Sequence, residues 1–347
     1  MSLSDIDRAP LRGNFAEWAK SLGRLAFAAA LLYALFHYGI IDLKQLAAVL
    51  HRPVNFIIAV ALLLAATLLA AQRWRYLLGA GGMLPKFWPV CVVSCMAALV
   101  GVVLPGAASG DVTRMIWVAK NMPGRKTMRI LSIVIDKAMA AYGLLLISTI
   151  GIFLRPGEIL ARKEMLILAL ALGGITAGVP LFLMSIRALD HWLHIANRIG
   201  ASTDRGFLLG TIAKALLGIF MYARLPGTLL KAFGTSMVSA VLMAASVAIL
   251  VPQNFDSTLG PADYAIALGA GMISNILPLT PGGIGIGEGA FAFICRILED
   301  HPTAAAFGTI FLSFRLAGIV ALLFFLPAFP FKRQLFRDVP AAVENHG

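Results

Sequence analysis

The 347-residue chain is 59% hydrophobic and only 13% charged, with a mean hydropathy of +0.86. A soluble domain carries about 45–50% apolar and about 25% charged residues, so this composition excludes an ordinary soluble protein. We expect an all-α polytopic protein of the inner (plasma) membrane. The net charge of +12 lies in short segments beside long apolar runs, a pattern that favours anionic lipid headgroups and not nucleic acid as partners.

The apolar runs predict six full spans, because a helix needs about 20 apolar residues to cross a bilayer. They are Leu22–Ile41, Val54–Ala71, Ile130–Leu154, Met165–Ile186, Ala232–Val251 and Ala305–Leu326. The first is longer than the apolar part of a signal peptide and is predicted to be retained. A shorter run, Leu208–Tyr222, contains Lys214 and predicts an amphipathic helix at the membrane surface. We expect residues 1–21 and 327–347 to be cytoplasmic segments around a transmembrane domain of residues 22–326.

Two further apolar stretches, Phe87–Leu104 and Tyr264–Leu277, run into the Pro/Gly-rich motifs LPGAASGD and LPLTPGGIGIGEG. If both stretches cross the membrane, 13 basic residues lie inside and 14 outside. If both enter and return on one side, 21 lie inside and 6 outside, with Lys137 and Arg315 within spans. The positive-inside rule favours the second arrangement, with both termini cytoplasmic.

The two re-entrant segments then enter from opposite sides of the membrane, as an inverted pair, and their sequences are similar. Each ends in Leu-Pro and is followed by glycine, by an acid (Asp111 or Glu288), and by a later span that carries charge. Paired Pro/Gly interruptions in two halves of a membrane protein indicate a transport site.

Ionisable residues within the apolar region are the strongest functional candidates, because each costs about 2.5–3.5 kcal/mol at the centre of a membrane helix. Arg315 is predicted to pair with Glu288 or Asp136, or to bind a phosphate or carboxylate. Asp111 and Arg114 are three residues apart and can pair on a helix. Arg73 and Arg75 flank Trp74 at the end of a predicted span. They either capture a lipid phosphate or extend to the interface beside an interfacial aromatic residue.

The glycines of PGGIGIGEG allow the backbone to approach a ligand and to form an anion-binding nest; alternatively, they allow tight helix packing. We expect no metal, because the histidines and cysteines show no ligand spacing, and no other cofactor. The predicted substrate-binding residues are Arg73, Arg75, Ser109, Asp111, Arg114, Asp136, Lys137, Asn275, Gly282, Gly283, Gly285, Glu288 and Arg315.

The order of these motifs resembles the lysylphosphatidylglycerol synthase transmembrane, or flippase-like, family. The resemblance covers roughly residues 20–330 and rests on Arg73-Trp74, LPGAASGDVTR, Asp136-Lys137, ILPLTPGGIGIGEG and SFRLAG. It implies a polytopic fold with re-entrant helices that translocates a lipid or lipid-linked molecule between leaflets. The residues that match the family's motifs are Arg73, Asp111, Arg114, Asp136, Glu288 and Arg315. Lys137 departs from the arginine of many relatives.

The resemblance also bears on enzymatic activity. Members that synthesise the aminoacyl lipid carry a soluble domain after the membrane part, whereas this chain ends at Gly347, so we expect no synthase activity and no enzyme. The leading hypothesis is a flippase or scramblase for an anionic or lipid-linked substrate, and a homo-oligomer is compatible with it. The alternatives are a membrane enzyme with Asp111 or Glu288 as general base, and an accessory subunit of a lipid pathway.

Overall fold

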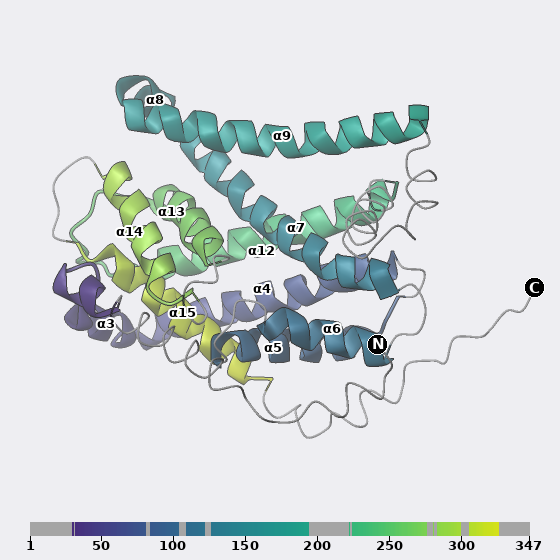
Figure 1. The fold of residues 1–347 in the computed structure, drawn as a ribbon. Helices are drawn as coiled ribbons and strands as arrows, with labels where there is room; N and C mark the ends of the chain where they lie inside the picture. Colours follow the sequence, from purple (N-terminus) through teal and green to yellow (C-terminus); the bar gives the residue numbers. More distant parts are fainter. Residues whose placement is uncertain are drawn as a thin grey trace, which may run out of the picture.

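A computed structural model describes residues 30, 32–80, 84–103, 109–121, 126–193, 222, 224–275, 280, 283–299 and 305–325. All regular structure in these ranges is helical, which confirms the predicted all-α class (Figure 1). The predicted terminal segments, part of the first predicted span (residues 22–29 and 31) and most of the predicted amphipathic helix lie outside these ranges. The helices are α3 (Leu43–Leu50), α4 (Pro53–Gly79), α5 (Phe87–Val103), α6 (Ser109–Asn121), α7 (Lys126–Phe153), α8 (Pro156–Ala161), α9 (Lys163–Leu193), α12 (Pro226–Leu250), α13 (Pro261–Ser274), α14 (Ile286–Leu298) and α15 (Phe307–Leu323).

Four predicted spans are helices long and apolar enough to cross a membrane. They are Pro53–Gly79, Arg129–Phe153, Lys163–Phe182 and Pro226–Leu250, so the chain is a multi-pass membrane protein. The sixth predicted span becomes α15, whose 17 residues extend about 25 Å at 1.5 Å per residue. That is shorter than a bilayer core of about 30 Å, so the prediction of six full spans is confirmed only in part.

Both Pro/Gly-interrupted stretches form antiparallel helical hairpins. In the first, Gly110 of α6 lies against Ala97 of α5, and in the second Gly287 of α14 lies near Gly271 of α13. The arms contain 13 to 17 residues, which is too short for a full span. This length agrees with the prediction that they do not cross the membrane, although their position in a bilayer stays a prediction.

The helices repeat in order: a long helix (α4 or α12), a hairpin (α5–α6 or α13–α14) and another helix (α7 or α15). The two long helices pack antiparallel, because Asn55 of α4 donates to the Ile249 carbonyl at 3.1 Å while Ser239 of α12 donates to the Ala66 carbonyl at 3.3 Å. α13 packs on α7 and α15 packs on α4. The two hairpins therefore follow opposite ends of the central α4–α12 pair.

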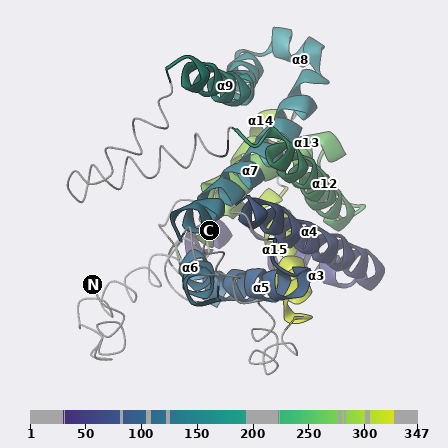
Figure 2. The same cartoon turned by 90° about the vertical axis from the view of Figure 1, so that its right-hand side faces the viewer.

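Helix α9 lies at the edge of the fold, away from α4 and α12; it packs on the end of α7 that leads to α8, and the two helices then diverge (Figures 1 and 2). Most of its apolar side chains are exposed, including Ile167, Leu170 and Phe182. In contrast, the core between α4 and the second hairpin is filled by stacked aromatic rings from Tyr264 and Phe291 and by Phe311. In a membrane, the exposed side of α9 contacts lipid chains.

Helices α5 and α6 of the first hairpin can pack closely because Gly110 has no side chain. A Cβ atom at this position would overlap the carbonyl oxygen of Ala97. We predict that Gly110→Ala lowers the unfolding temperature of the purified protein, with a cost of about 1–3 kcal/mol for overpacking. Gly178→Ala on α9 is the matched control, since nothing lies within 4 Å of a Cβ atom at Gly178. Thermal unfolding in detergent measures both, and equal unfolding temperatures would contradict the prediction.

Candidate functional site

A partly open cavity of about 300 Å³ lies beside α4, α5, α6 and α7. Its α5 wall consists of small residues, Ala97, Ala98 and Gly101, which leave room between the helices. Its other walls are strongly polar, although α4 and α7 are long and apolar enough to span a membrane. Three cations and two carboxylates line it: Arg73, Arg114, Lys137, Asp111 and Asp136.

Asp136 of α7 is the centre of this cluster. Its side chain is buried, and its two oxygen atoms bind two different arginines. Arg73 Nε of α4 is 2.7 Å from Oδ1, and Arg114 Nη1 of α6 is 2.9 Å from Oδ2. Arg73 also donates to Ser236 Oγ of α12 at 3.2 Å. One carboxylate therefore joins α4, α6 and α7, which belong to the first helix–hairpin–helix unit (α4 to α7). Through Arg73 it is also linked to α12 of the second unit (α12 to α15).

Aromatic residues pack next to Arg114. Trp74 is fully buried and donates its indole N–H to Ser132 Oγ at 3.1 Å. The Arg114 guanidinium carbon lies 4.8 Å from the centre of the Trp74 ring, a cation–π contact worth about 0.5–2 kcal/mol. Trp117 packs against Trp74 at 5.9 Å. These contacts restrict the orientation of Arg114.

The alternative interpretation of Arg73 and Trp74 as interfacial residues does not fit this geometry, because both side chains are buried. The helix that was predicted to end at Ala71 continues to Gly79, since its polar last turns pack inside the protein. Arg75 lies apart from the cavity lining, and its Nε donates to the Pro85 carbonyl at 2.7 Å.

Asp111 and Lys137 form an ion pair at the rim of the cavity, where the Lys137 side chain is 47% exposed. Arg114 and Asp111 share helix α6, but each pairs with α7, and the predicted local pair between them is replaced by these two contacts. Ser109 begins α6, and its side chain is outside the described part of the structure.

Two further predicted residues, Glu288 of α14 and Arg315 of α15, form a second cluster. Glu288 is fully buried and pairs with Arg315, with Nη1 3.1 Å from Oε1. Its Oε2 accepts the Gly285 N–H at 2.7 Å, and Arg315 also donates to the Gly283 carbonyl at 3.1 Å. Of the two acids predicted to pair with Arg315, the structure therefore places Glu288 beside it.

The glycines of the second hairpin have conformational and packing roles. Gly283 (φ 72°) and Gly285 (φ 87°) adopt left-handed conformations that side chains disfavour. Asn275 ends α13 and lies so close to Gly283 and Gly287 that a Cβ atom at either would overlap it. Gly282 lies outside the described ranges. The anion-binding role of this segment stays a prediction.

The two clusters share one arrangement. A Gly-acid pair, Gly110-Asp111 or Gly287-Glu288, lies in the first turn of the returning helix, and the acid binds a base on the helix that follows. The predicted residues thus divide between two halves of the fold and do not form one group. Sequence reasoning missed Ser132, Ser236 and Trp117, because a single serine or tryptophan in a helix carries no signal of its own. Within the described ranges, no group of three His, Cys, Asp or Glu residues could hold a metal ion.

A model of the family described as the lysylphosphatidylglycerol synthase TM region matches residues 21–325. The chain belongs to this family. The match confirms the resemblance inferred from the motifs and covers both helix–hairpin–helix units. No curated protein matches the chain.

The burial of Asp136 predicts different effects for the two ion pairs of α7. Asp136→Asn leaves two arginines without their counter-ion and is expected to destabilise the protein by about 3–5 kcal/mol, as removal of one partner from a buried pair does. Lys137→Gln removes an exposed partner and is expected to cost about 1 kcal/mol or less. Thermal unfolding of both variants in the same detergent checks this order, and the reverse order would contradict it.

Proposed function

We propose that this protein translocates a phospholipid or lipid-linked molecule between the leaflets of the inner membrane, as a flippase or scramblase. The observation that carries the proposal is the charged cavity, which borders the apolar helices α4, α5 and α7 as well as α6. Membership of the lysylphosphatidylglycerol synthase TM family supports a role connected with membrane lipids. We propose no catalytic step, and therefore no enzyme activity.

The charge of the cavity suits a phosphate-containing headgroup. Its three cations and two carboxylates leave one excess positive charge. This excess can pair with the negative charge of an anion that enters the cavity. Arg114 uses one terminal nitrogen for Asp136, and its planar fork has further donors. Charge-assisted hydrogen bonds to phosphate are about twice as strong as neutral ones.

We assign different tasks to the residues of this cluster. Arg73 is buried and held by Asp136 and Ser236, so it provides a fixed positive charge at the buried side of the cavity. Lys137 is the most exposed member and can exchange Asp111 for an incoming headgroup. Arg114 lies between these positions and binds the phosphate. The enclosed Glu288–Arg315 pair holds the turn of the second hairpin.

We further propose that the hairpins α5–α6 and α13–α14 are re-entrant and enter from opposite sides, with both termini of the chain in the cytoplasm. Their short arms and the antiparallel packing of α4 and α12 support this arrangement.

Reconstitution into liposomes with fluorescent lipids of anionic, zwitterionic and cationic headgroups tests the proposal. Quenching of the outer-leaflet label reports exchange between leaflets. Loss of a charge-assisted hydrogen bond costs about 1.5–3 kcal/mol, and about 1.4 kcal/mol is tenfold. We therefore expect Arg114→Gln to slow exchange of the anionic lipid by about tenfold or more, while Lys120→Gln, an exposed change on the same helix, leaves it unaffected.

Two results would count against the proposal. If the wild-type protein exchanges none of the three lipid classes faster than protein-free liposomes do, translocation of these lipids is refuted. If the wild type exchanges anionic lipid but Arg114→Gln and Lys120→Gln equal it, translocation stands and the assignment of the headgroup site is wrong.

A further inference from the structure

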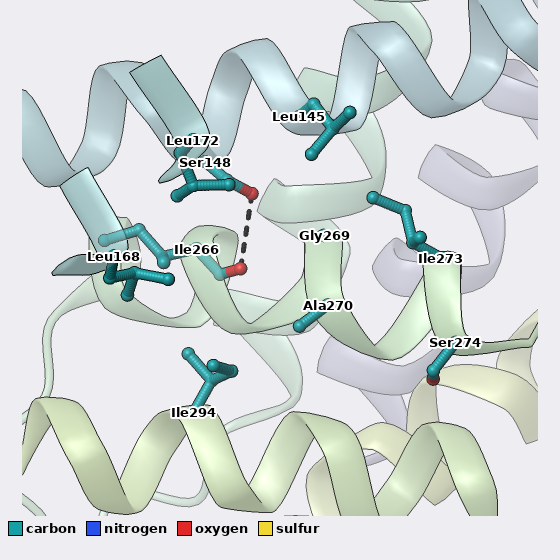
Figure 3. A pocket seen from close by; sticks show the side chains of 10 residues that line it. All are labelled: Leu145, Ser148, Leu168, Leu172, Ile266, Gly269, Ala270, Ile273, Ser274 and Ile294. Atoms are coloured by element: carbon teal, nitrogen blue, oxygen red, sulfur yellow. Dashed lines mark hydrogen bonds between the residues drawn. The ribbon is translucent and has the colours of Figure 1, made fainter. Parts of the chain in front are cut away.

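A second, apolar cavity of about 240 Å³ lies among α7, α9, α13 and α14. Figure 3 shows Leu168 and Leu172 of α9 and Leu145 of α7 on one side, with Ile273 and Ile294 facing them. The cavity is partly open, like the charged cavity, and it borders a different stretch of the same helix α7.

The hydroxyl groups at this cavity already have partners. Ser148 Oγ donates to the Ile266 carbonyl at 3.2 Å (Figure 3), and Ser274 Oγ donates to the Gly271 carbonyl at 2.8 Å. The rest of the lining is aliphatic or glycine. An apolar cavity that offers water no hydrogen-bond partners stays dry, so its natural occupant is apolar.

The surroundings identify the kind of occupant. α7 and α9 are both helices that can cross a membrane, and the side chains next to the cavity lining point outward and are apolar. Ile167 beside Leu168 is 67% exposed, and Phe293 beside Ile294 is 64% exposed. The medium around such a surface is lipid acyl chains. An empty cavity would lose dispersion contacts along its whole lining, and a chain from the bilayer restores them.

Both cavities border the same face of α7. Residues 137, 141, 145 and 148 follow each other at spacings of four and three, which places Lys137, Ala141, Leu145 and Ser148 on the same side of the helix. Lys137 lines the charged cavity, whereas Leu145 and Ser148 line the apolar one. At 1.5 Å per residue, Lys137 and Leu145 are about 12 Å apart along the axis.

We infer that the apolar cavity binds one acyl chain of the lipid whose phosphate headgroup occupies the charged cavity, with the lipid lying along this face of α7. This inference rests on the proposed function and extends it. It restricts the substrate to molecules with a long hydrocarbon chain, because a soluble phosphate compound fills only one of the two cavities.

An anionic phospholipid with a photoreactive diazirine in its acyl chain, reconstituted with the full chain in liposomes, tests the inference. We expect labelling of peptides around Leu145, Leu168 and Ile273, located by mass spectrometry. Ala270→Phe fills the cavity from α13 and should reduce both this labelling and anionic-lipid exchange by about tenfold. Ala171→Phe adds the same ring to the exposed face of α9 and should leave both unchanged.

Unfolding temperatures of the two phenylalanine variants separate loss of the cavity from misfolding. If Ala270→Phe is destabilised, Ile273→Ala provides the second variant, because it enlarges the cavity and should increase labelling. A competition arm adds decyl phosphate or glycerol phosphate in excess. Decyl phosphate is expected to compete with labelling, and competition by glycerol phosphate alone would overturn the requirement for a chain.

The remaining outcomes distinguish this inference from the proposed function. If the wild type exchanges lipid but its cavity peptides are not labelled, the chain site is wrong and translocation stands. If a folded Ala270→Phe loses labelling but keeps exchange, the bound chain belongs to a resident lipid, and the inference is also overturned. Labelling by a protein that moves no lipid would refute the proposed function instead.

Discussion

The first half of the structure depends on one requirement, which is to neutralise a carboxylate carried by an apolar helix. Asp136 cannot remain charged and unpaired among the side chains of α7 without a large desolvation cost. Its two oxygens accept from Arg73 and Arg114, which come from two other helices. The positions of α4, α6 and α7 are therefore linked by charge as well as by apolar packing. The two arginines carry one more charge than Asp136 removes, and in our proposal this excess favours an anionic headgroup.

The second half meets a similar requirement in a more enclosed way. Glu288 is fully buried, with one oxygen on Arg315 and the other on the Gly285 N–H. Where α6 carries Arg114 three residues after its acid, α14 carries the buried Phe291 three residues after Glu288. That ring packs against Tyr264 and Phe311. Two units built in the same order therefore differ in character, because one surrounds a charged cavity and the other an aromatic core.

Close backbone contact makes both hairpins compact enough for this arrangement. Gly110 and Gly287 each precede the acid of their hairpin and face the incoming helix, where a side chain would overlap its neighbour. The acid is thereby held at the start of the returning helix, near the positive end of its dipole, where negative charge is favourable. Packing by glycine and placement of charge are consequently parts of the same local structure.

The sequence by itself determined the all-α class, the multi-pass character and the family, because these follow from apolar run lengths and from motif order along the chain. It also identified the acids and bases, since ionisable residues in apolar runs stand out at once. Only the tertiary structure decided which of them meet. Arg73 with Asp136 joins residues 63 positions apart, and Ser236 joins the same arginine from the other half. No periodicity encodes such pairs, because the first depends on how α4 packs on α7 and the second on how α4 packs on α12. The antiparallel α4–α12 pair also places the two hairpins at its opposite ends, so the predicted residues form two clusters.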